Sequence, residues 1–294
     1  MVARIPSEDL SRCLALDQSL LGEIARESED SYYRFSLPKR SGQRRWIDAP
    51  LGPLKECQRR LLDRILYRIP IHEAAHGFVP GRSILTNARC HETQPWVIKF
   101  DIKNFFPSTT RDQVMETLQC LSKLSLSDAE LIGTLLTRGG VLPQGAPTSP
   151  HMANSVFRAI DENLSALARE YGMSYTRYAD DLTFSGSSIP IDLEKRVKLL
   201  VGEGGYHLAH QKTRRMGQHQ RQMVTGLVVN NRARLPRPVR RRLRAIIHDI
   251  DQRGLTTALS RSPWATAEQL WGYFNFDAMV NDAARPSAMQ SPQK

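Results

Sequence analysis

The chain has 294 residues, and its 41 lysines and arginines outnumber 30 acidic residues, which gives a formal net charge of +11. A hydrophobic fraction of 40% is enough for a sizeable core and excludes collagen-like and intrinsically disordered chains. The sequence has no apolar run near the roughly 18 residues of a membrane span. Its four cysteines form no CxxC pair, so we expect a cytoplasmic protein with reduced thiols and no membrane partner. The positive surplus favours a polyanionic partner such as nucleic acid.

The first predicted elements alternate between helix and strand. Apolar residues at three- and four-residue steps predict an amphipathic helix over 54–69 with a basic opposite face. Residues 96–102 (WVIKFDI) have the composition of a short buried strand, and Asp101 lies at its end. Ser127, with a glutamate three residues later, forms a capping box that predicts the start of a helix, which stops at Gly139.

The second half of the chain adds a hairpin and a basic helical region. Ser149 and the following proline predict a helix that ends near Gly172. Two β-rich runs, 174–178 and 182–184, are separated by three residues and predict a β-hairpin. Further along, the sequence predicts a helix over 191–201 and a strand over 223–229. Seven arginines lie between 232 and 244 and lead into an amphipathic helix over 243–250. A last helix is predicted over 266–279. The pattern indicates an α+β fold with a basic helical C-terminal module.

Three carboxylates fall at the ends of predicted strands. Asp101 closes one strand, and Asp180 and Asp181 occupy the hairpin turn. If these strands neighbour each other in one sheet, the acids converge on one edge, where a bound divalent cation relieves their repulsion. Oxygen ligands suit Mg²⁺, and a pair of such ions can activate a 3′-hydroxyl and stabilise a departing pyrophosphate. Alone, however, an Asp-Asp pair is more commonly a polar turn.

The sequence around these acids resembles the reverse transcriptase family. Residues 178–181 (YADD) match its YxDD hairpin, 100–106 (FDIKNFF) match its first metal-binding segment, and 142–150 (LPQGAPTSP) match its LPQGxxxSP loop. The three motifs occur in the family's order, and the resemblance extends at least from about Tyr33 to Leu235. It implies a right-hand polymerase with an antiparallel palm sheet and a helical thumb.

The resemblance also implies domain boundaries. Fingers and palm would occupy 1–230, with the palm mainly in 94–106 and 150–230. A basic helical thumb over 231–283 would bind RNA or duplex, and we expect a disordered tail over 284–294.

By the same resemblance, Asp101, Asp180 and Asp181 are the catalytic carboxylates. Together with the carbonyl of Ile102 they would hold two Mg²⁺ ions, for which Mn²⁺ could substitute. Phe106 falls where the family places a steric gate that excludes the 2′-hydroxyl of ribonucleotides, although the position also suits a core phenylalanine.

Five further residues would bind the incoming deoxynucleoside triphosphate. Lys39 and Arg45 of a fingers hairpin would clamp the triphosphate, although a solvated surface charge is the commoner role of any single basic residue. Gln144 would contact the nucleotide, and Gly145 would let backbone approach closely. Lys212 falls where the family carries a lysine proposed to protonate pyrophosphate.

Two short segments resemble signatures of bacterial retron reverse transcriptases. They are NAxxH at Asn87–His91 and VTG at Val224, Thr225 and Gly226, of which the second would form a strand that grips the primer. With Arg240, Arg241 and Arg244 of the arginine-rich region, these residues would contact nucleic acid. The resemblance implies a structured non-coding RNA partner (msr-msd), priming from a 2′-hydroxyl, a branched RNA–DNA product (msDNA), and an accessory effector or toxin protein in defence against phage.

Three alternatives remain open at this stage. Residues 72–76 (HEAAH) match the HExxH zinc-peptidase motif, but the nearby prolines and Gly77 leave barely one helical turn for His72 and His76. A catalytically inactive nucleic-acid-binding protein would share the basic charge. Another bacterial reverse transcriptase, of the diversity-generating or abortive-infection type, would share the catalytic motifs.

Overall fold

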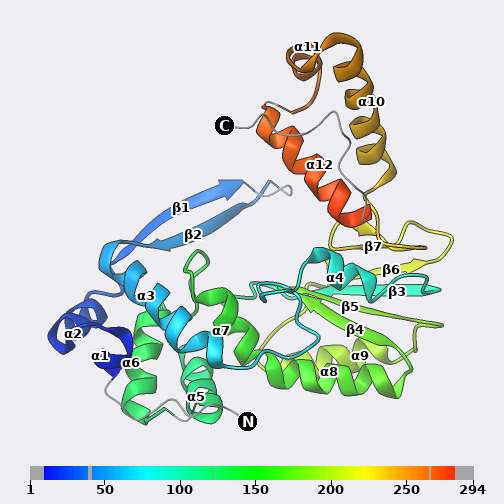
Figure 1. Ribbon diagram of the computed structural model, residues 1–294. Helices are drawn as coiled ribbons and strands as arrows, with labels where there is room; N and C mark the ends of the chain where they lie inside the picture. The colour runs from blue at the N-terminus through cyan, green and yellow to red at the C-terminus, as the bar shows by residue number, and fades with distance from the viewer. Residues whose placement is uncertain (1–9, 39–41, 123, 265, 282–294) are drawn as a thin grey trace.

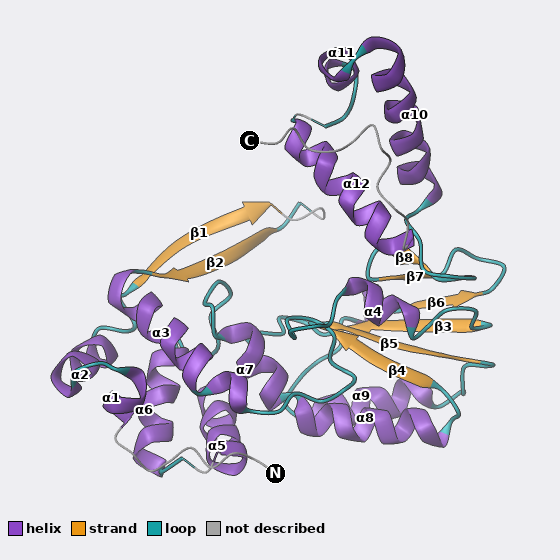
Figure 2. Cartoon of the chain, viewed as in Figure 1, coloured by secondary structure: helices purple, strands orange, loops and turns teal. Residues whose placement is uncertain are grey.

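The structure is a computed structural model that describes residues 10–38, 42–122, 124–264 and 266–281. A mainly helical N-terminal half lies beside a small antiparallel sheet, a long hairpin rises above the helices, and the C-terminal helices stand above the sheet (Figure 1). Helices and strands mix along the chain as the expected α+β class requires (Figure 2). Among the described residues, no helix combines the length and apolar character that crossing a membrane would require.

The N-terminal half packs helices against the base of the hairpin. The hairpin strands are β1 (Tyr32–Pro38) and β2 (Arg44–Pro50), paired antiparallel over their whole length. The helices below them, in chain order, are α1 (Leu10–Leu14), α2 (Gln18–Arg26), α3 (Gly52–Arg64), the short 3₁₀ turn η1 (Leu66–Arg68), α5 (Arg111–Ser122), α6 (Leu126–Leu136) and α7 (Ser149–Val156). Their apolar faces meet in one core that includes Leu54, Leu61 and Leu135.

A four-stranded antiparallel sheet lies at the centre of the fold. Its strands are ordered β4 (Ser174–Tyr178), β5 (Asp181–Gly186), β3 (Trp96–Asp101) and β6 (Arg214–Gly217). Helices α8 (Arg158–Glu170) and α9 (Leu193–Glu203) cover one face, and α4 (Ile84–Arg89) lies on the other (Figure 2). The 3₁₀ turn η2 (His210–Lys212) leads into β6. Alternation along β3 buries Ile98 in the core that the N-terminal helices share with α8 and α9, and Val97 in a second core.

That second core belongs to the C-terminal elements. These are the short strands β7 (Met223–Val224) and β8 (Leu227–Val228), and the helices α10 (Arg237–Arg253), α11 (Leu255–Ser260) and α12 (Ala267–Asn281). Leu243 and Ile246 of α10 meet Phe274 of α12, and the same core takes in Val97 and Leu85 from the sheet and α4.

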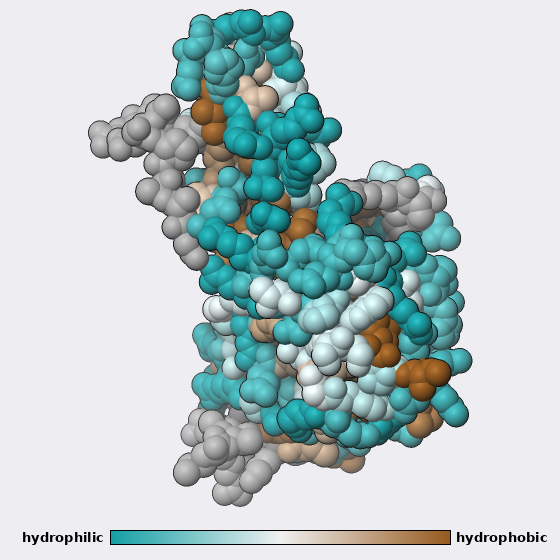
Figure 3. Space-filling model, turned by 90° about the vertical axis from the view of Figure 1, so that its right-hand side faces the viewer, coloured by the Kyte–Doolittle hydropathy of each residue, from teal (hydrophilic) through white to brown (hydrophobic). Residues whose placement is uncertain are grey.

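From the side, hydrophilic residues cover most of the visible surface, interrupted by small hydrophobic patches (Figure 3).

Several predicted elements differ from those observed. The cap of α6 is Ser125, whose hydroxyl accepts from the Asp128 amide at 3.1 Å, rather than Ser127. The helix predicted from Ser149 is divided at Phe157 into α7 and α8, and the one predicted over 54–69 ends at Arg64. The strand predicted over 223–229 is a tight hairpin.

Candidate active site

The three carboxylates converge on one edge of the sheet, as the sequence predicts. Asp101 ends β3 and lies directly opposite Asp181, the first residue of β5. Asp180 lies in the tight turn between β4 and β5, beside Ala179, which has a left-handed φ of 55°. The amide of Ile102 donates to the carbonyl oxygen of Asp180 at 2.8 Å, which ties the turn to the strand that carries Asp101.

The electrostatics of this edge are those of crowded acids. Burial, followed by the charges of Asp101 and Asp181, raises the pKa of Asp180. Two ammonium groups balance the outer acids: Lys212 Nζ donates to Asp101 Oδ1 at 2.7 Å, and Lys99 Nζ lies 3.2 Å from Asp181 Oδ2. An edge with this charge pattern is suited to a cation that binds several carboxylates at once.

The carboxylates fit a metal that takes only part of its ligands from the protein. Within the described ranges, no group of three or more His, Cys, Asp or Glu side chains is arranged so that it could hold a metal ion. Mg²⁺ retains waters and commonly binds through one or two carboxylates plus substrate phosphates, so an open edge with Asp101 and Asp180 suits it better than a closed cage would. Cys and His ligands, which zinc prefers, do not contribute to this edge.

A basic cavity of about 550 Å³ lies between the β1–β2 hairpin and the loop that precedes α7. Its lining contains the predicted Arg45 and Gln144, together with Arg34, Arg44, Arg138 and Asn104, which sequence reasoning did not single out. Lys39 lies outside the described residues. The lining also contains Glu29 and Asp48, and Asp48 pairs with Arg34 and Arg138. The four arginines outnumber the two acids, so the cavity keeps a positive surplus that suits a polyphosphate.

The loop and the hairpin touch through their backbones. The amide of Asp48 donates to the carbonyl of Gln144 at 2.8 Å, and Arg138 donates to the Asp48 carboxylate. Gly145 has a φ of 134°, and a Cβ there would lie 2.8 Å from the carbonyl oxygen of Asp48. The backbone of the β1–β2 hairpin therefore approaches Gly145 closely, and a side chain at this position would collide with it.

Phe106 lies in a group of aromatic rings on the segment after β3. It is half-buried, and its ring centroid is 6.2 Å from that of Phe78 and 5.5 Å from that of Phe105. The exposed Phe78 in turn lies 6.4 Å from Tyr178, which precedes the turn that carries Asp180. Neighbouring rings are tilted against one another by 40–51°, and together they form an aromatic row from Phe106 to the turn that carries Asp180.

The two short segments that resemble retron signatures pack against each other. Thr225 and Gly226 form the turn between β7 and β8, with φ values of 44° and 84°, and the Thr225 hydroxyl donates to the Ile84 carbonyl of α4 at 2.8 Å. Asn87 and His91 lie on and just after α4, on the side of the sheet. This contact positions the C-terminal elements over the sheet.

Burial corrects the nucleic-acid contacts expected of Asn87, His91 and Val224. Their exposed fractions are 1%, 0% and 0%, so these side chains support the fold and do not reach a ligand on the surface. His91 bridges two strands, with one ring nitrogen 2.7 Å from the Ser185 hydroxyl and the other 2.7 Å from that of Thr176. The primer-grip strand is likewise a turn, in which Gly226 is exposed and Thr225 is partly exposed.

The arginines of α10 remain available for contact. Arg241 and Arg244 are exposed and Arg240 is half-buried. The helix turns one apolar side into the second core and leaves its basic side outward.

The zinc-peptidase interpretation is wrong. Residues 72–76 form no helix, and they run instead along the outer edge of β4, where the His76 amide donates to the Arg177 carbonyl at 2.7 Å. The His76 ring lies 2.8 Å from the Thr86 hydroxyl, and the His72 ring accepts from the Ala74 amide at 3.1 Å. The two imidazoles therefore do not share a helical face from which to bind one ion.

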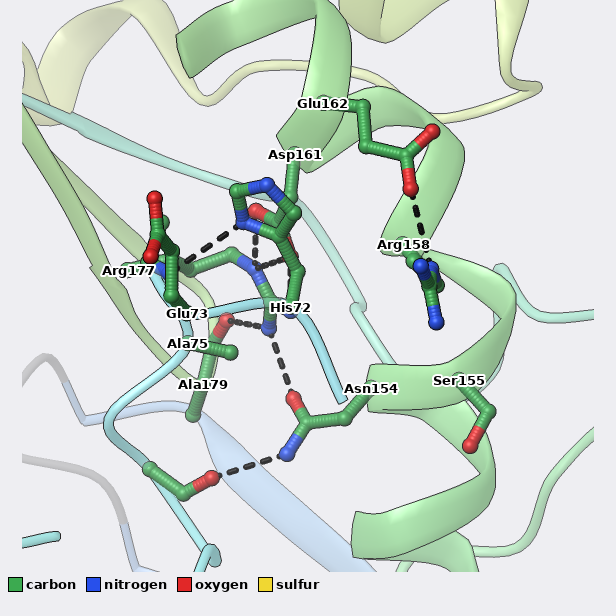
Figure 4. Close-up of polar contacts among 12 residues, drawn as sticks. His72, Glu73, Ala75, Asn154, Ser155, Arg158, Asp161, Glu162, Arg177 and Ala179 are labelled. Carbon is green, nitrogen blue, oxygen red and sulfur yellow. Dashed lines mark hydrogen bonds and ion pairs between the residues drawn. The ribbon is translucent and has the colours of Figure 1, made fainter. Parts of the chain in front are cut away.

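A buried polar group that the sequence does not predict lies beneath the turn that carries Asp180. Arg177, Asp161 and Asn154 are joined by hydrogen bonds and reach the backbone of Ala179 (Figure 4). Arg177 lies next to the YADD motif, but nothing in the local sequence shows that its partners come from α7 and α8. The one available signal is an arginine inside a strand that otherwise reads as buried.

Comparisons with known proteins agree with this site. The family described as reverse transcriptase (RNA-dependent DNA polymerase) matches residues 37–228. The retron Mx162 reverse transcriptase of Myxococcus xanthus is 41% identical over 282 residues, which cover 83% of this chain and 58% of the relative. The retron Ec86 reverse transcriptase of Escherichia coli is 30% identical over 251 residues, which cover 82% of this chain and 77% of the relative. The chain therefore belongs to the reverse transcriptase family and, within it, to the retron reverse transcriptases.

The chain matches only part of the length of two Myxococcus relatives, and a solved telomerase shares its fold. The chain spans about three fifths of the length of the retron Mx162 and Mx65 relatives, with 58% and 62% of their lengths covered. A solved telomerase from Candida albicans, in complex with a fragment of telomeric RNA, shares the fold with a TM-score of 0.53 at 10% identity, over 90% of this chain and 62% of that one.

Proposed function

We propose that this chain is a retron reverse transcriptase that synthesises DNA on an RNA template with Mg²⁺. The observation that carries the proposal is the pairing of Asp101 opposite Asp181, with Asp180 on the adjoining turn. Membership of the retron reverse transcriptases supports the reaction class. Diversity-generating and abortive-infection enzymes are less well supported, since the relatives compared above are retron enzymes.

The domain roles are those that the resemblance to reverse transcriptases implies. Residues 1–230 would form fingers and palm, with the palm mainly in 94–106 and 150–230, and 231–283 would form the thumb. The β1–β2 hairpin and the C-terminal helices stand on either side of the sheet edge, which supports a right-hand arrangement around a template (Figure 1). The tail expected over 284–294 lies outside the described residues.

The metal ions and the proton donor would lie at the sheet edge. Asp101 and Asp180, with Asp181 and the Ile102 carbonyl, would hold two Mg²⁺ ions, which supply an activated primer hydroxyl and neutralise charge on the phosphates. Lys212 is bonded to Asp101, so its ammonium is close enough to the edge to give a proton to the leaving pyrophosphate.

The nucleotide would enter over the basic cavity beside the hairpin. Arg45, with Lys39, would bind the triphosphate by charge and forked hydrogen bonds, and Gln144 would contact the sugar or base. Gly145 would act indirectly, because it seats the loop against the hairpin. The flat ring of Phe106 would lie under the sugar and leave no room for a 2′-hydroxyl.

The partner would be a structured non-coding RNA (msr-msd) that also supplies the primer. A 2′-hydroxyl of that RNA would start synthesis and leave a branched RNA–DNA product (msDNA). Arg240, Arg241 and Arg244 would grip its phosphates, with Thr225 and Gly226 near the primer end. The physiological role would be defence against phage together with an effector protein.

The metal role is tested by Asp180→Asn in a primer-extension assay with Mg²⁺, an RNA template and deoxynucleotides. We expect DNA synthesis to fall by at least about 10³-fold, since the change removes one charge from the metal-binding edge. Asp63→Asn, which removes the same charge from an exposed position on α3, is the matched control and should retain full activity. Synthesis that persists in Asp180→Asn would contradict the assignment.

The retron product is tested on nucleic acid that co-purifies with the protein. We expect a branched RNA–DNA hybrid that a 2′–5′ debranching enzyme converts to linear DNA and that is missing from Asp180→Asn. A linear product in the unmodified protein would favour another kind of bacterial reverse transcriptase, and RNA without any DNA would favour an inactive binding protein.

A further inference from the structure

A buried ion pair lies directly beneath the catalytic turn. Arg177 of β4 and Asp161 of α8 both have fully buried side chains, with Nη2 and Oδ2 2.6 Å apart and Nε 2.9 Å from Oδ1. The Tyr175 hydroxyl donates to the same carboxylate at 2.7 Å, and the guanidinium lies 4.6 Å from the centroid of the Phe157 ring. Buried ion pairs add little net stability compared with apolar residues of similar volume, because both charges lose their water. The pair therefore calls for an explanation other than stability.

The remaining nitrogen of the guanidinium reaches the catalytic turn. Arg177 Nη1 donates to the carbonyl of Ala179 at 3.1 Å and to Asn154 Oδ1 at 2.8 Å. That carbonyl belongs to the peptide that links Ala179 to Asp180. Because Ala179 has a left-handed φ of 55°, which costs a non-glycine residue about 1–2 kcal/mol, the turn needs surrounding contacts to keep this shape.

Asn154 connects this network to the opposite side of the turn. Its Nδ2 donates to the carbonyl of Gly77 at 2.8 Å (Figure 4). A Cβ on Gly77 would lie 2.7 Å from the amide nitrogen of Ala179, although the Gly77 backbone itself is not left-handed. Glycine is therefore required at this position by the close approach of the turn.

The peptide groups on both sides of Asp180 are thus held. Arg177 binds the carbonyl before it, and the Ile102 amide binds the carbonyl of Asp180 itself at 2.8 Å. We propose that Asn154 and Arg177, braced by Asp161 and backed by Gly77, are positioning residues that set the orientation of Asp180 and hence its affinity for the divalent cation. The inference rests on the proposed function, and the side chains of Asn154, Arg177 and Asp161 are fully buried beneath the turn.

The test is Mn²⁺ binding by Asn154→Ala, measured by the EPR signal of unbound Mn²⁺. The change removes the link from Arg177 to Gly77 and leaves the Arg177–Asp161 pair intact. Loss of a residue that orients a metal ligand typically costs about 10- to 100-fold in affinity or activity, and we expect the dissociation constant for Mn²⁺ to rise about tenfold. The Mg²⁺ concentration for half-maximal primer extension should rise by the same factor.

Ser155→Ala is the matched control. Ser155 follows Asn154 on α7 and is also buried, but its hydroxyl donates to the His151 carbonyl of its own helix at 3.0 Å. This variant should bind Mn²⁺ like the unmodified protein. Because Mn²⁺ binding is measured without synthesis, an unmodified protein that binds the ion and makes no DNA would refute the proposed function alone.

Gly77→Ala tests the opposite side of the turn. The added methyl must displace Ala179, so we expect the same tenfold loss of Mn²⁺ affinity. Gly202→Ala on α9, where a Cβ meets nothing within 4 Å, should change nothing. The proposal is wrong if both Asn154→Ala and Gly77→Ala melt cooperatively and bind Mn²⁺ as the unmodified protein does. It is also wrong if neither variant folds, because the network would then be purely structural.

Discussion

Phe106 illustrates how one side chain could decide which sugar the site accepts. Its ring belongs to a row of mutually tilted aromatic rings that runs through Phe78 to Tyr178, beside the turn that carries Asp180. A planar group in that position excludes a substituent on one face of the sugar by steric overlap alone. The exclusion needs no charge or hydrogen bond, so a smaller side chain should remove it.

We expect Phe106→Ala to lower the preference for deoxynucleotides over ribonucleotides by at least about tenfold, equivalent to about 1.4 kcal/mol in the difference between transition-state free energies. The measurement is the ratio of kcat/KM for the two sugars in primer extension. Tyr67→Ala, which truncates an exposed ring on η1, is the control. An unchanged ratio would leave Phe106 with a packing role.

His91 links acid sensitivity to the sheet. Burial lowers the pKa of His91 to about 3, so the folded protein keeps its ring neutral while the unfolded chain takes up a proton below about pH 6.5. The unfolded state therefore binds more protons between these values, and stability falls as the pH falls through this window. The slope for one such histidine is up to about 1.4 kcal/mol per pH unit.

We expect His91→Gln to reduce the loss of unfolding free energy between pH 7 and pH 5 by about 2 kcal/mol, although the variant itself should be less stable at pH 7. Denaturant unfolding at the two pH values measures the difference. His248→Gln, at an exposed position on α10, should leave the pH dependence unaltered. Equal acid sensitivity of His91→Gln and the unmodified protein would contradict the buried neutral ring.

At the scale of elements, local patterns predicted the parts that bear the acids. The β-rich composition around Asp101 and the short gap between 174–178 and 182–184 were enough to identify β3 and the β4–β5 hairpin. The single strand predicted over 223–229 differs from the observed β7–β8 hairpin because Thr225, with its left-handed φ of 44°, is not a typical residue for such a turn. The HExxH spacing is typical of a helix, but residues 72–76 run along the outer edge of β4 and form no helix.

The buried network could not be predicted, because its contacts are distant in sequence. Arg177 and Asp161 are 16 residues apart, and Asn154 reaches Gly77 across 77 residues. Periodicity reports which side of an element is buried, but it does not report which side chain lies opposite. The nucleic-acid contacts expected of Asn87 and His91 came from the resemblance of NAxxH to a retron signature. A motif does not report whether its side chains are buried, and the folded structure shows that these two are.

Helix α10 should dominate the salt dependence of RNA binding. Arg241 and Arg244 are exposed on its basic side, and each phosphate contact contributes about 0.7–0.9 to the slope of log K against log salt concentration. We expect the double variant Arg241→Gln, Arg244→Gln to lower the magnitude of that slope by about 1.5 in filter-binding titrations.

The control for this prediction lies on the same helix. Arg253 donates to Asp249 at 2.5 Å and is neutralised locally, so Arg253→Gln should keep the original slope. A double variant with an unchanged slope would show that the phosphates contact another surface.

At the scale of the whole molecule, the buried apolar residues that the structure describes form two cores that meet at the sheet. Val97 and Leu85 lie in the same core as Leu243 and Phe274, so the C-terminal helices complete the burial of residues from the N-terminal part. Each such side chain contributes about 1.5–3 kcal/mol when buried, and a domain has only about 5–15 kcal/mol of net stability. Exposing several of them at once should therefore cost most of that margin.

We expect a chain truncated after Asn230 to lose its cooperative thermal transition and to bind the dye ANS, which reports exposed apolar surface. The comparison is the full chain under the same conditions, by differential scanning calorimetry and dye fluorescence. A truncated chain that melts cooperatively at the original temperature would show that the sheet and helices are stable independently.

The edges of the four-stranded sheet have a consequence for how the protein behaves at high concentration. On the outer side of β4, the Arg177 amide donates to the Ala74 carbonyl at 2.7 Å and the Arg177 carbonyl accepts from His76, so this edge is already paired. The other edge, β6, is four residues long and carries two exposed arginines, Arg214 and Arg215. Exposed strand edges recruit strands from other molecules, whereas short, charged or covered edges do not. Copies of this chain that carry no nucleic acid should therefore stay dispersed in concentrated solution instead of joining through their sheets.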